Sequence, residues 1–327
     1  MIRRASDRRG VAMVAALWLV VAIAVVALSF SIDAKERRTL GLNAAERGQG
    51  NAFALGALAS VQARLDVALR SNAQNLQALA GTRSGDPWMF ADSLFSGPVY
   101  VDSTRVDVQV RDLGTQLNIN LASVDQLKAF LAYSLGDYGR ADQLAATIVD
   151  WRDLDDTPQM NGDERDGYVR KGLLAVPNNA NFRRVDELLM VEGMTPAIFA
   201  RVANDLTTFG NGQININTAP ISVLRSIPGI TDNIIANILN ARSRGLRISS
   251  IAQVVPGAAQ GGGGRGGPPQ DLMARVQLQQ LTQAAGVTTT QLLVTMMARA
   301  APQAQPARLV ALVQRTGTNA TITWEQP

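Results

Sequence analysis

The chain contains 327 residues, 46% of them hydrophobic and 18% charged, and its 31 basic and 27 acidic residues give a formal net charge of +4. Because the charges almost balance, the composition does not indicate a nucleic-acid-binding surface, although the sequence pI is about 9.8. Cysteine and histidine are both absent, which excludes disulfide bonds, thiol nucleophiles, histidine-dependent catalysis and zinc sites built from these residues. Catalysis by carboxylates alone remains open, but the composition favours a protein that is not an enzyme.

The first predicted element is an apolar helix. Residues 11–32 are apolar except for Ser29 and Ser31, and as a helix they would span about 33 Å, enough to cross a bilayer core of about 30 Å. Four arginines precede the segment and predict a cytoplasmic amino terminus, with the rest of the chain across the membrane. They are Arg3, Arg4, Arg8 and Arg9.

This apolar segment has three interpretations. It is longer than the usual hydrophobic region of a signal peptide, about 7–15 residues, although a conventional cleavage site exists at Ala27-Leu28-Ser29. It could also be a simple membrane anchor. The third interpretation starts from Gly10, which ends the basic leader directly before the apolar run. This arrangement resembles the type IV prepilins, and the resemblance implies cleavage after Gly10, with Val11 as the first mature residue.

Beyond the membrane, the helical pattern continues to about residue 70. Alanine, leucine, arginine, glutamate and glutamine dominate this stretch, and apolar residues recur at helical spacing. They include Leu55, Leu58, Leu65 and Leu69. Each glycine costs up to about 1 kcal/mol relative to alanine in a helix, so the glycines should weaken or bend this one. They are Gly41, Gly48, Gly50 and Gly56.

The next predicted elements are β-strands. In "PVYVDSTRVDVQVRDLG" apolar and polar residues alternate, so that Val106, Val108 and Val110 face one side of a half-buried strand. The alternation returns near the carboxyl end in "TQLLVTMMA", "ARLVALVQRTG" and "ATITWEQ", which predicts a three-stranded meander. Residues 118 to about 250 have helical patterns instead. The predicted fold class is therefore α+β, with a small antiparallel sheet and a large all-α domain inserted into it.

The predicted helical insert contains repeats. "LNINLASVDQL" from Leu117 is similar to "ININTAPISVL" from Ile214, and each has a short extended piece followed by a helix start. A second pairing aligns "ELLMVEGMTPAIFARV" with "SVLRSIPGITDNIIANIL", in which Gly193 matches Gly229. We expect helix-hairpin-helix-like units whose glycines allow tight turns. The Gly/Pro-rich residues 256–270 predict a flexible loop.

One stretch of the insert, "DWRDLDDTPQMNGDERDGY" (residues 150–168), is strongly acidic. So many carboxylates in a turn-rich loop repel one another unless a cation binds, and a hard cation with oxygen ligands fits best. The loop is not an EF-hand, because Pro158 occupies the position where that motif requires glycine. The alternatives are a solvated acidic loop and a hydrolytic carboxylate pair. The seven carboxylates are Asp150, Asp153, Asp155, Asp156, Asp163, Glu164 and Asp166.

The repeats also point to an alternative function. Helix-hairpin-helix DNA-binding proteins contact a phosphate with the backbone amides of a Gly-hydrophobic-Gly turn. Here Thr231 replaces the second glycine of one turn, Glu192 precedes Gly193 in the other, and "DNIIANIL" contains no basic residue. Because basic residues near the phosphates supply most non-specific affinity, nucleic acid is not expected as a partner. A membrane-anchored DNA-binding protein of DNA uptake remains the alternative.

Taken in order, these stretches resemble the K-type minor pseudopilins of bacterial type II secretion systems (the GspK family). The resemblance extends from the leader to about residue 238 and is carried by "RRGVAMVAALWLVVAIAVVALSFS", "LGTQLNINLASVDQL", "DWRDLDDTPQMNGDERDGY", "VDELLMVEGMTP" and "GQININTAPISVLRSIPGIT". A further mark is Ala15, the fifth residue after the expected cut, where most pilins and pseudopilins carry glutamate. Since an unpaired ionisable group is costly in lipid, its absence suits a subunit with no neighbour above it.

The resemblance implies a pseudopilin fold and a structural role at the tip of the periplasmic pseudopilus. There the subunit would initiate or cap assembly with the I- and J-type minor pseudopilins during export of folded proteins across the outer membrane. It also implies processing by prepilin peptidase with N-methylation, contacts with the inner-membrane secretion platform and membrane lipid, and a single-pass inner-membrane location with a periplasmic carboxyl-terminal domain. Family members bind Ca²⁺ in the acidic loop, and the ligands implied by position are Asp153, Asp155, Asp156, Asn161, Glu164 and Asp166.

Together these patterns predict a division of the chain into six parts. They are the leader (1–10), the transmembrane helix (11–32), its periplasmic continuation (33–85), a discontinuous sheet domain (86–117 and 271–327), the helical domain (118–255, with the acidic loop 150–168) and the Gly/Pro-rich loop (256–270).

Overall fold

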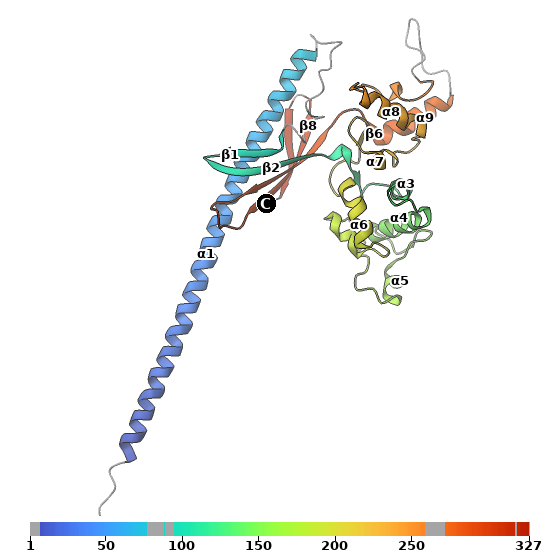
Figure 1. Cartoon of the computed structure of the whole chain (residues 1–327). Helices are drawn as coiled ribbons and strands as arrows, with labels where there is room; N and C mark the ends of the chain where they lie inside the picture. The colour runs from blue at the N-terminus through green and yellow to red at the C-terminus, as the bar shows by residue number, and fades with distance from the viewer. Residues whose placement is uncertain (1–6, 77–87, 89–94, 259–271, 318, 327) are drawn as a thin grey trace, which may run out of the picture.

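The structure is a computed structural model, and it describes residues 7–76, 88, 95–258, 272–317 and 319–326. It contains a long amino-terminal helix, a five-stranded sheet packed against one half of that helix, and a helical domain at the end of the sheet (Figure 1). The predicted fold class is confirmed. Residues 1–6 of the expected leader and 259–270 of the expected flexible loop lie outside the described residues.

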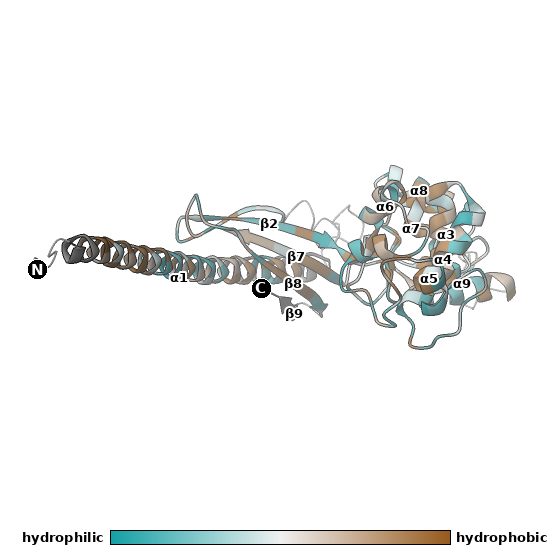
Figure 2. Ribbon diagram, turned by 90° about the horizontal axis from the view of Figure 1, so that it is seen from below, coloured by the Kyte–Doolittle hydropathy of each residue, from teal (hydrophilic) through white to brown (hydrophobic). Residues whose placement is uncertain are grey.

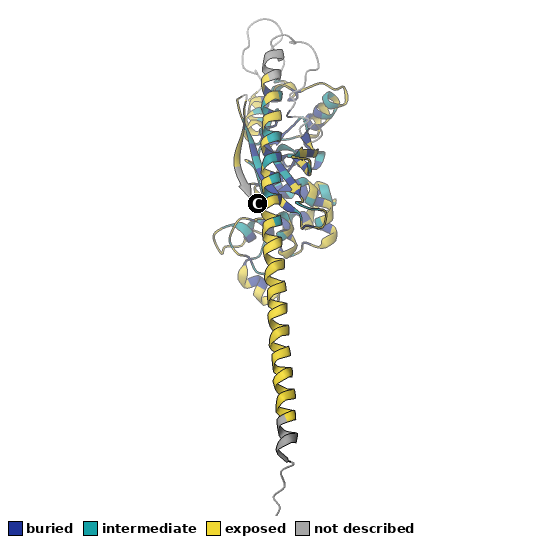
Figure 3. Ribbon diagram, turned by 90° about the vertical axis from the view of Figure 1, so that its left-hand side faces the viewer, coloured by how far each residue is buried: buried dark blue, intermediate teal, exposed yellow. Residues whose placement is uncertain are grey.

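Helix α1 (Asp7–Leu76) joins the apolar segment to the amphipathic segment without a break. Within the described chain, one helix is long and apolar enough to cross a membrane, and it is α1. Its most apolar window has a mean hydropathy of 2.7 and is entirely exposed. Figures 2 and 3 show this brown, fully exposed half extending away from the rest of the molecule.

The second half of α1 packs on the sheet through Ala54, Ala57, Leu58, Val61, Leu65 and Leu69. Leu55, which the sequence pattern grouped with these leucines, is exposed. Two of the glycines expected to weaken the helix permit its closest contacts with the sheet. A Cβ on Gly50 would lie 2.8 Å from the Cβ of Ala307, and one on Gly56 would lie 2.9 Å from Cγ1 of Val101.

The sheet is antiparallel throughout, in the order β1-β2-β7-β8-β9. Its strands are β1 (Gly97–Val101), β2 (Thr104–Asp112), β7 (Gln291–Ala298), β8 (Ala307–Thr316) and β9 (Asn319–Gln326). The last three form the predicted meander. Val106, Val108 and Val110 are buried in the core between the sheet and α1, as predicted.

The stretch treated as one strand in the sequence is a hairpin of β1 and β2. Its turn residues Asp102 and Ser103 have positive φ angles of 47° and 70°. Positive φ at both central residues is the geometry of the two-residue turn that matches the twist of paired strands. Asp tolerates this conformation well, but the sequence "VDST" lacks the glycine that usually signals it.

The helical domain has a core of its own, separate from the core under α1. Its α-helices are α3 (Val124–Leu135), α4 (Tyr138–Arg152), α5 (Arg165–Arg170), α6 (Pro196–Val202), α7 (Ile221–Leu224), α8 (Asp232–Ser243) and α9 (Leu272–Ala284). Its 3-10 helices are η2 (Leu113–Thr115), η3 (Val185–Met190), η4 (Ala203–Asp205) and η5 (Ile251–Gln253). Two parallel pairs of short strands complete it: β3 (Leu117–Asn118) with β4 (Leu206–Thr207), and β5 (Ile214–Asn215) with β6 (Ala285–Gly286).

Helix α9 changes one predicted boundary. Residues from 271 onward were expected in the sheet domain, but Ala274, Leu281 and Ala285 lie in the core of the helical domain. The reason is helical periodicity, because Ala274, Leu278 and Leu281 share one face of α9 and pack on that core. The sheet domain therefore resumes only near β7.

The helical domain consists of two similar halves, residues 117–207 and 214–286, and the short strand pairs mark them. In the first half, Oδ1 of Asn118 accepts a hydrogen bond from the backbone N–H of Asn120 at 2.9 Å. In the second, Oδ1 of Asn215 accepts one from the N–H of Asn217 at 3.0 Å. The first sequence pairing thus corresponds to a shared asparagine turn.

An arginine from a following helix closes each asparagine turn. Arg152, at the end of α4, donates to the carbonyl oxygens of Ile119 and Ala122. Arg242, in the last turn of α8, donates to the carbonyl of Ile216 at 2.6 Å and to that of Ala219 at 2.7 Å. The two halves therefore satisfy the same buried backbone groups in the same way.

The second sequence pairing, of Gly193 with Gly229, is confirmed as two hairpin turns of the same kind: the N–H of Met194 donates to the carbonyl of Val191 and that of Ile230 to the carbonyl of Ile227, each at 3.1 Å, and Thr195 and Thr231 cap the helices that follow. The two turns nevertheless occupy different places in the two-half repeat. Gly229 lies between α7 and α8, and its counterpart between α3 and α4 is Gly136; their φ angles are 76° and 71°. Gly193 precedes α6, and its counterpart before α9 is Gly257, with φ angles of 82° and 79°. The two paired glycines resemble each other because both occupy left-handed turn positions, which favour glycine.

Asp112, at the end of β2, connects the sheet to the second half. It is buried, and its Oδ2 accepts hydrogen bonds from the hydroxyls of Thr218 at 3.0 Å and Thr289 at 2.7 Å. Its Oδ1 accepts one from the N–H of Gly114 at 2.8 Å. The side chain of Asn215 donates to Thr289 at 3.0 Å. This network holds both chain crossings between the two domains.

Candidate metal centre

Three carboxylates meet at the end of α4. Asp150 lies in the last turn of α4, Asp153 follows that helix directly, and Glu164 precedes α5. Residues 154–163 form the loop that returns Glu164 to this helix end. One carboxylate oxygen from each of the three residues lies within 4.8 Å of the other two. We call these three residues the carboxylate cluster.

Most of the buried oxygens in the carboxylate cluster have no hydrogen-bond partner among the described residues. Asp150 is fully buried and Glu164 is 5% exposed. Asp150 Oδ2, Asp153 Oδ1 and both carboxylate oxygens of Glu164 are buried and have no hydrogen-bond partner in the described part of the chain. The other oxygen of Asp150 accepts a hydrogen bond from the N–H of Gln159 at 3.0 Å. Because buried charges without partners are strongly destabilising, protons or a cation must neutralise the cluster.

The pKa values of the three carboxylates also indicate that the cluster needs a counter-charge. Burial raises the pKa of Asp150 to about 6, and the charge of Asp153 adds to the shift. Burial also raises the pKa of Glu164 to about 7, with contributions from Asp150 and Asp153. The pKa of Asp153 is raised as well, by burial first. Each ionised form is therefore disfavoured without a counter-charge, which a cation held between the carboxylates would supply.

The cluster contains two of the six ligands implied by the resemblance, Asp153 and Glu164, and adds Asp150. Asp150 is one of the seven carboxylates of the acidic stretch, but it is not among the ligands that the resemblance implies. The three-residue spacing between Asp150 and Asp153 is the sequence signal that could have identified Asp150 as a candidate ligand. Residues three apart on a helix share a face, so Asp150 and Asp153 were candidates to act together if α4 was expected to continue to residue 152.

The other four residues are not part of the cluster. Asp155 Oδ1 accepts a hydrogen bond from the N–H of Thr157, and Asp156 Oδ1 accepts one from the side chain of Asn179. The charges of both still contribute to the raised pKa of Glu164. The remaining two residues point elsewhere: the side chain of Asn161 donates to Asp142 Oδ2 at 2.7 Å, and Asp166 is exposed in the first turn of α5.

Aromatic and ionic contacts hold the acidic loop on the helical core. The ring of Trp151 lies 5.9 Å from that of Tyr168, and both residues are buried. The Tyr168 hydroxyl accepts a hydrogen bond from the N–H of Glu192 at 2.9 Å. Lys171 forms ion pairs of 2.7 Å with both Asp163 and Glu192. The loop is thus tied to the turn before α6.

The hairpin turns are not arranged to receive a phosphate. At Gly229, the Gln277 side chain of α9 donates to the glycine carbonyl at 3.0 Å, and a Cβ on this glycine would lie 2.6 Å from Gln280 Oε1. At Gly193, the preceding Glu192 places a carboxylate beside the turn. Helix α9 covers one turn and a negative charge adjoins the other, so neither favours DNA.

The residues expected at the processing site lie in α1. Gly10 and Val11 belong to its described backbone, so the end of the leader and the apolar segment form one continuous helix. Ala15 is exposed, like the rest of the apolar half.

Comparisons with known proteins agree with this architecture. A search among curated proteins found no match. The family model described as "Type II secretion system (T2SS), protein K" matches residues 106–209, which contain most of β2, the first half of the helical domain and the carboxylate cluster. Among solved structures, the chain is similar to one in the crystal structure of the GspK-GspI-GspJ complex from the enterotoxigenic Escherichia coli type 2 secretion system.

That match has a TM-score of 0.56 and 18% sequence identity, and it covers 85% of this chain and 97% of the other. At this identity it shows a shared fold. The family match over β2 and the first half, together with this fold, confirms the resemblance of the chain to the K-type minor pseudopilins of type II secretion systems.

Proposed function

We propose that this protein is a structural minor pseudopilin at the tip of a type II secretion pseudopilus. It would initiate or cap assembly with I- and J-type minor pseudopilins during export of folded proteins across the outer membrane. The solved relative belongs to a complex of GspK, GspI and GspJ, which supports partners of these two types. Prepilin peptidase and the inner-membrane secretion platform are further partners in this proposal, which assigns the chain no enzymatic activity.

The observation that carries this proposal is where the helical domain attaches. Gly50 of α1 approaches Ala298 and Ala307, so the turn between β7 and β8 faces the apolar end of α1. The helical domain joins the opposite ends of β2 and β7 and lies beside the sheet, displaced sideways from α1 (Figure 1). The apolar half of α1 is therefore free to contact neighbours in the membrane, whereas the helical domain fills space beside the sheet and would obstruct the packing of a further subunit there.

The amino-terminal half of α1 supports the same role. Its exposed apolar segment suits a single-pass anchor in the inner membrane, with a cytoplasmic amino terminus and a periplasmic carboxyl-terminal domain. Ala15 leaves the start of this segment without a carboxylate to pair with a neighbour. This is the arrangement expected of a subunit that begins or ends a stack.

We also propose that calcium binds at the carboxylate cluster. Asp150, Asp153 and Glu164 offer buried, unpartnered carboxylate oxygens, and calcium prefers oxygen ligands of this kind. Asp155 and Asp156 are further candidate donors, because their charges reach Glu164. A bound ion would neutralise these groups and hold the loop against α4, so its contribution is to stability.

The test is co-expression of the full chain with prepilin peptidase and the I- and J-type pseudopilins of the same bacterium. We expect a mature, N-methylated amino terminus at Val11, co-purification of the three pseudopilins, and restored secretion in a strain lacking its K-type subunit. A chain that forms no such complex and restores no secretion would overturn the proposal. An amino terminus at Phe30 would indicate a signal peptide, and an intact Met1 a simple anchor.

The DNA-uptake alternative makes a different prediction. A DNA-binding protein would retard duplex DNA at low salt and release it as salt rises. We expect no retardation, because α9 covers Gly229 and Glu192 adjoins the other turn. Salt-sensitive retardation together with failure to bind pseudopilins would favour the alternative.

A further inference from the structure

One face of the sheet packs on α1, and no described element covers the other, because the helical domain lies beyond the strand ends (Figures 1 and 2). Along β2 and β7, the residues that alternate with the buried ones point to this uncovered face. We call it the outer face and define it by Tyr100, Arg105, Asp107, Met297, Arg299 and Arg308.

Strand register makes these residues neighbours. Tyr100 pairs with Arg105 across β1 and β2, and Met297 lies between Asp107 of β2 and Arg308 of β8. Tyr100 is 67% exposed and Met297 44% exposed. Large apolar side chains left open beside arginines are typical of protein interfaces.

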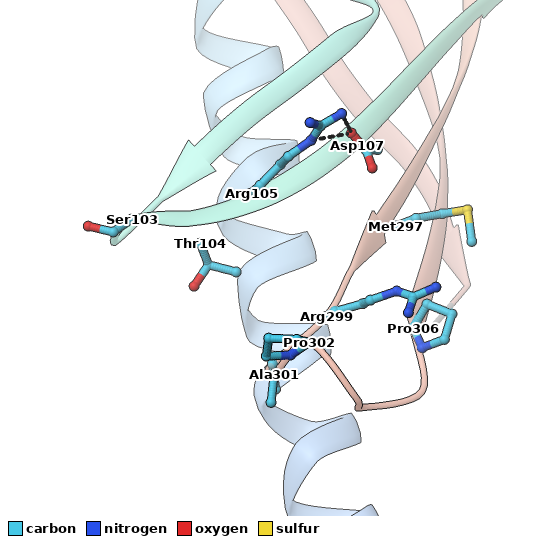
Figure 4. A pocket seen from close by; sticks show the side chains of 10 residues that line it. Ser103, Thr104, Arg105, Asp107, Met297, Arg299, Ala301, Pro302 and Pro306 are labelled. Atoms are coloured by element: carbon cyan, nitrogen blue, oxygen red, sulfur yellow. Dashed lines mark hydrogen bonds and ion pairs between the residues drawn. The ribbon is translucent and has the colours of Figure 1, made fainter.

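A hollow of about 480 Å³ lies at the membrane-side end of this face, between the β1–β2 turn and the β7–β8 connection (Figure 4). Arg105 and Asp107 line one side of it, and Met297, Arg299 and Pro306 line the other. The hollow therefore has an apolar wall with arginines at its rim. Its shape would admit a side chain of a partner.

The charges of the outer face are unequal. Arg105 forms an ion pair with Asp107 at 2.8 Å, so these two charges largely neutralise each other. Arg299 and Arg308 are exposed, and neither forms an ion pair or hydrogen bond with any residue that the structure describes. A partner that brings carboxylates to this face would pair with both.

The position of the face selects the kind of partner. The β7–β8 connection begins and ends beside Gly50, where α1 leaves the sheet toward its apolar end. Helix α1 rises about 26 Å between Asp33 and Gly50, so lipid headgroups at the end of the apolar segment lie far below the hollow. A neighbouring protein with its own apolar anchor would hold its folded domain at the same distance from the membrane as the hollow, and could reach it.

We propose that the outer face and its hollow bind the acidic surface of a neighbouring membrane-anchored pseudopilin. Arg299 and Arg308 pair with its carboxylates, and one of its apolar side chains enters the hollow beside Met297. This inference rests on the proposed function, because that function supplies neighbours of this kind.

The test uses the full-length chain in mild detergent and the I- and J-type pseudopilins of the same bacterium. The charge-reversed variant is Arg299→Glu with Arg308→Glu. The matched control is Arg140→Glu with Arg183→Glu, which makes the same charge change at two exposed arginines of the helical domain. A third variant, Arg299→Lys with Arg308→Lys, keeps the charge. Binding is measured at low and high salt, and melting temperatures check folding.

We expect the Arg299→Glu, Arg308→Glu variant to bind about tenfold more weakly or worse, and the control and lysine variants to bind within about twofold of the unmodified chain. Unchanged binding by this variant, or an equal loss in the control, would overturn the inference alone. Self-association of the unmodified chain that only the charge-reversed variant loses would assign the face to a second copy. Failure of the unmodified chain to bind either pseudopilin would overturn the proposed function itself.

Discussion

The two halves of the helical domain share a frame but differ in the segment after the arginine. Arg152 and Arg242 each hold the carbonyls of an asparagine turn. In the first half a long acidic loop with the carboxylate cluster separates Arg152 from η3, whereas only a short connection separates Arg242 from η5. The shared frame is the asparagine turn with its arginine. Because the second half has this frame without an acidic loop, hydrogen bonds and apolar packing are enough to form it. The acidic loop of the first half is an addition, and its own charges must be neutralised.

The largest expected effect tests whether the frame is shared. Arg152→Ala and Arg242→Ala should each lower the free energy of unfolding by about 3 kcal/mol, because each leaves buried carbonyls unsatisfied. Urea denaturation of the full chain would measure both. A much smaller loss for one variant would show that the two halves are not equivalent.

Calcium should affect only the first half. At a calcium concentration of about 100 times its Kd, the free energy of unfolding should rise by about 2.7 kcal/mol, and hydrogen exchange should slow around α4 and α5. Glu164→Gln should abolish this gain. Asp166→Asn, which removes an exposed carboxylate of the same loop, should keep it. An unchanged melting temperature after chelation would contradict the site.

The stability and position of the second half should depend on its contacts with the sheet through Asp112. Asp112→Asn should lower the free energy of unfolding by about 2 kcal/mol, because a buried carboxylate that accepts several hydrogen bonds loses its charge. The calcium effect should persist. The distribution of distances between spin labels on β8 and α8 should broaden in this variant. It should not broaden in the control Asp107→Asn, whose carboxylate is exposed.

Saturating calcium should remove the pH dependence of stability between pH 8 and 6. The folded-state pKa values of Asp150 and Glu164, about 6 and about 7, exceed those of unfolded carboxyls. Without calcium, folding therefore favours proton uptake, and stability should rise as pH falls from 8 to 6. Protons compete with calcium, so its Kd should increase roughly tenfold over the same range. Calcium titrations at both pH values would show a pH-independent Kd if these carboxylates were not ligands.

The smallest effects concern the paired turns. Gly136→Ala should cost about 1 kcal/mol, since its φ of 71° is unfavourable for alanine and no atom lies nearby. Gly229→Ala should cost somewhat more, because its Cβ would also meet Gln280. Equal losses would mean that α9 moves away from the turn without cost.

The sequence was most informative where the pattern is local. The apolar segment of α1, the alternation of Val106, Val108 and Val110, and the asparagine turns all follow from period and spacing within a few residues. The position of the acidic loop could be predicted for the same reason.

The rest depends on contacts between distant segments. Gly50 and Gly56 read as helix-weakening residues until strands β1 and β8 are placed against them. The role of Asp150 requires the end of α4 and the return of Glu164. Helix α9 joins the helical core although it is near the sheet strands in sequence, and the different places of Gly193 and Gly229 in the two-half repeat appear only in three dimensions.

The helical domain leaves and re-enters the sheet between two adjacent antiparallel strands. Asp112 of β2 lies directly opposite Leu292 of β7, so the gap that residues 113–290 bridge is no wider than an ordinary hairpin connection. The five-stranded sheet is therefore complete without the insert. A short turn between β2 and β7 could replace the insert and would leave a fold of one long helix packed on a sheet, and a different domain could be inserted between the same two strands.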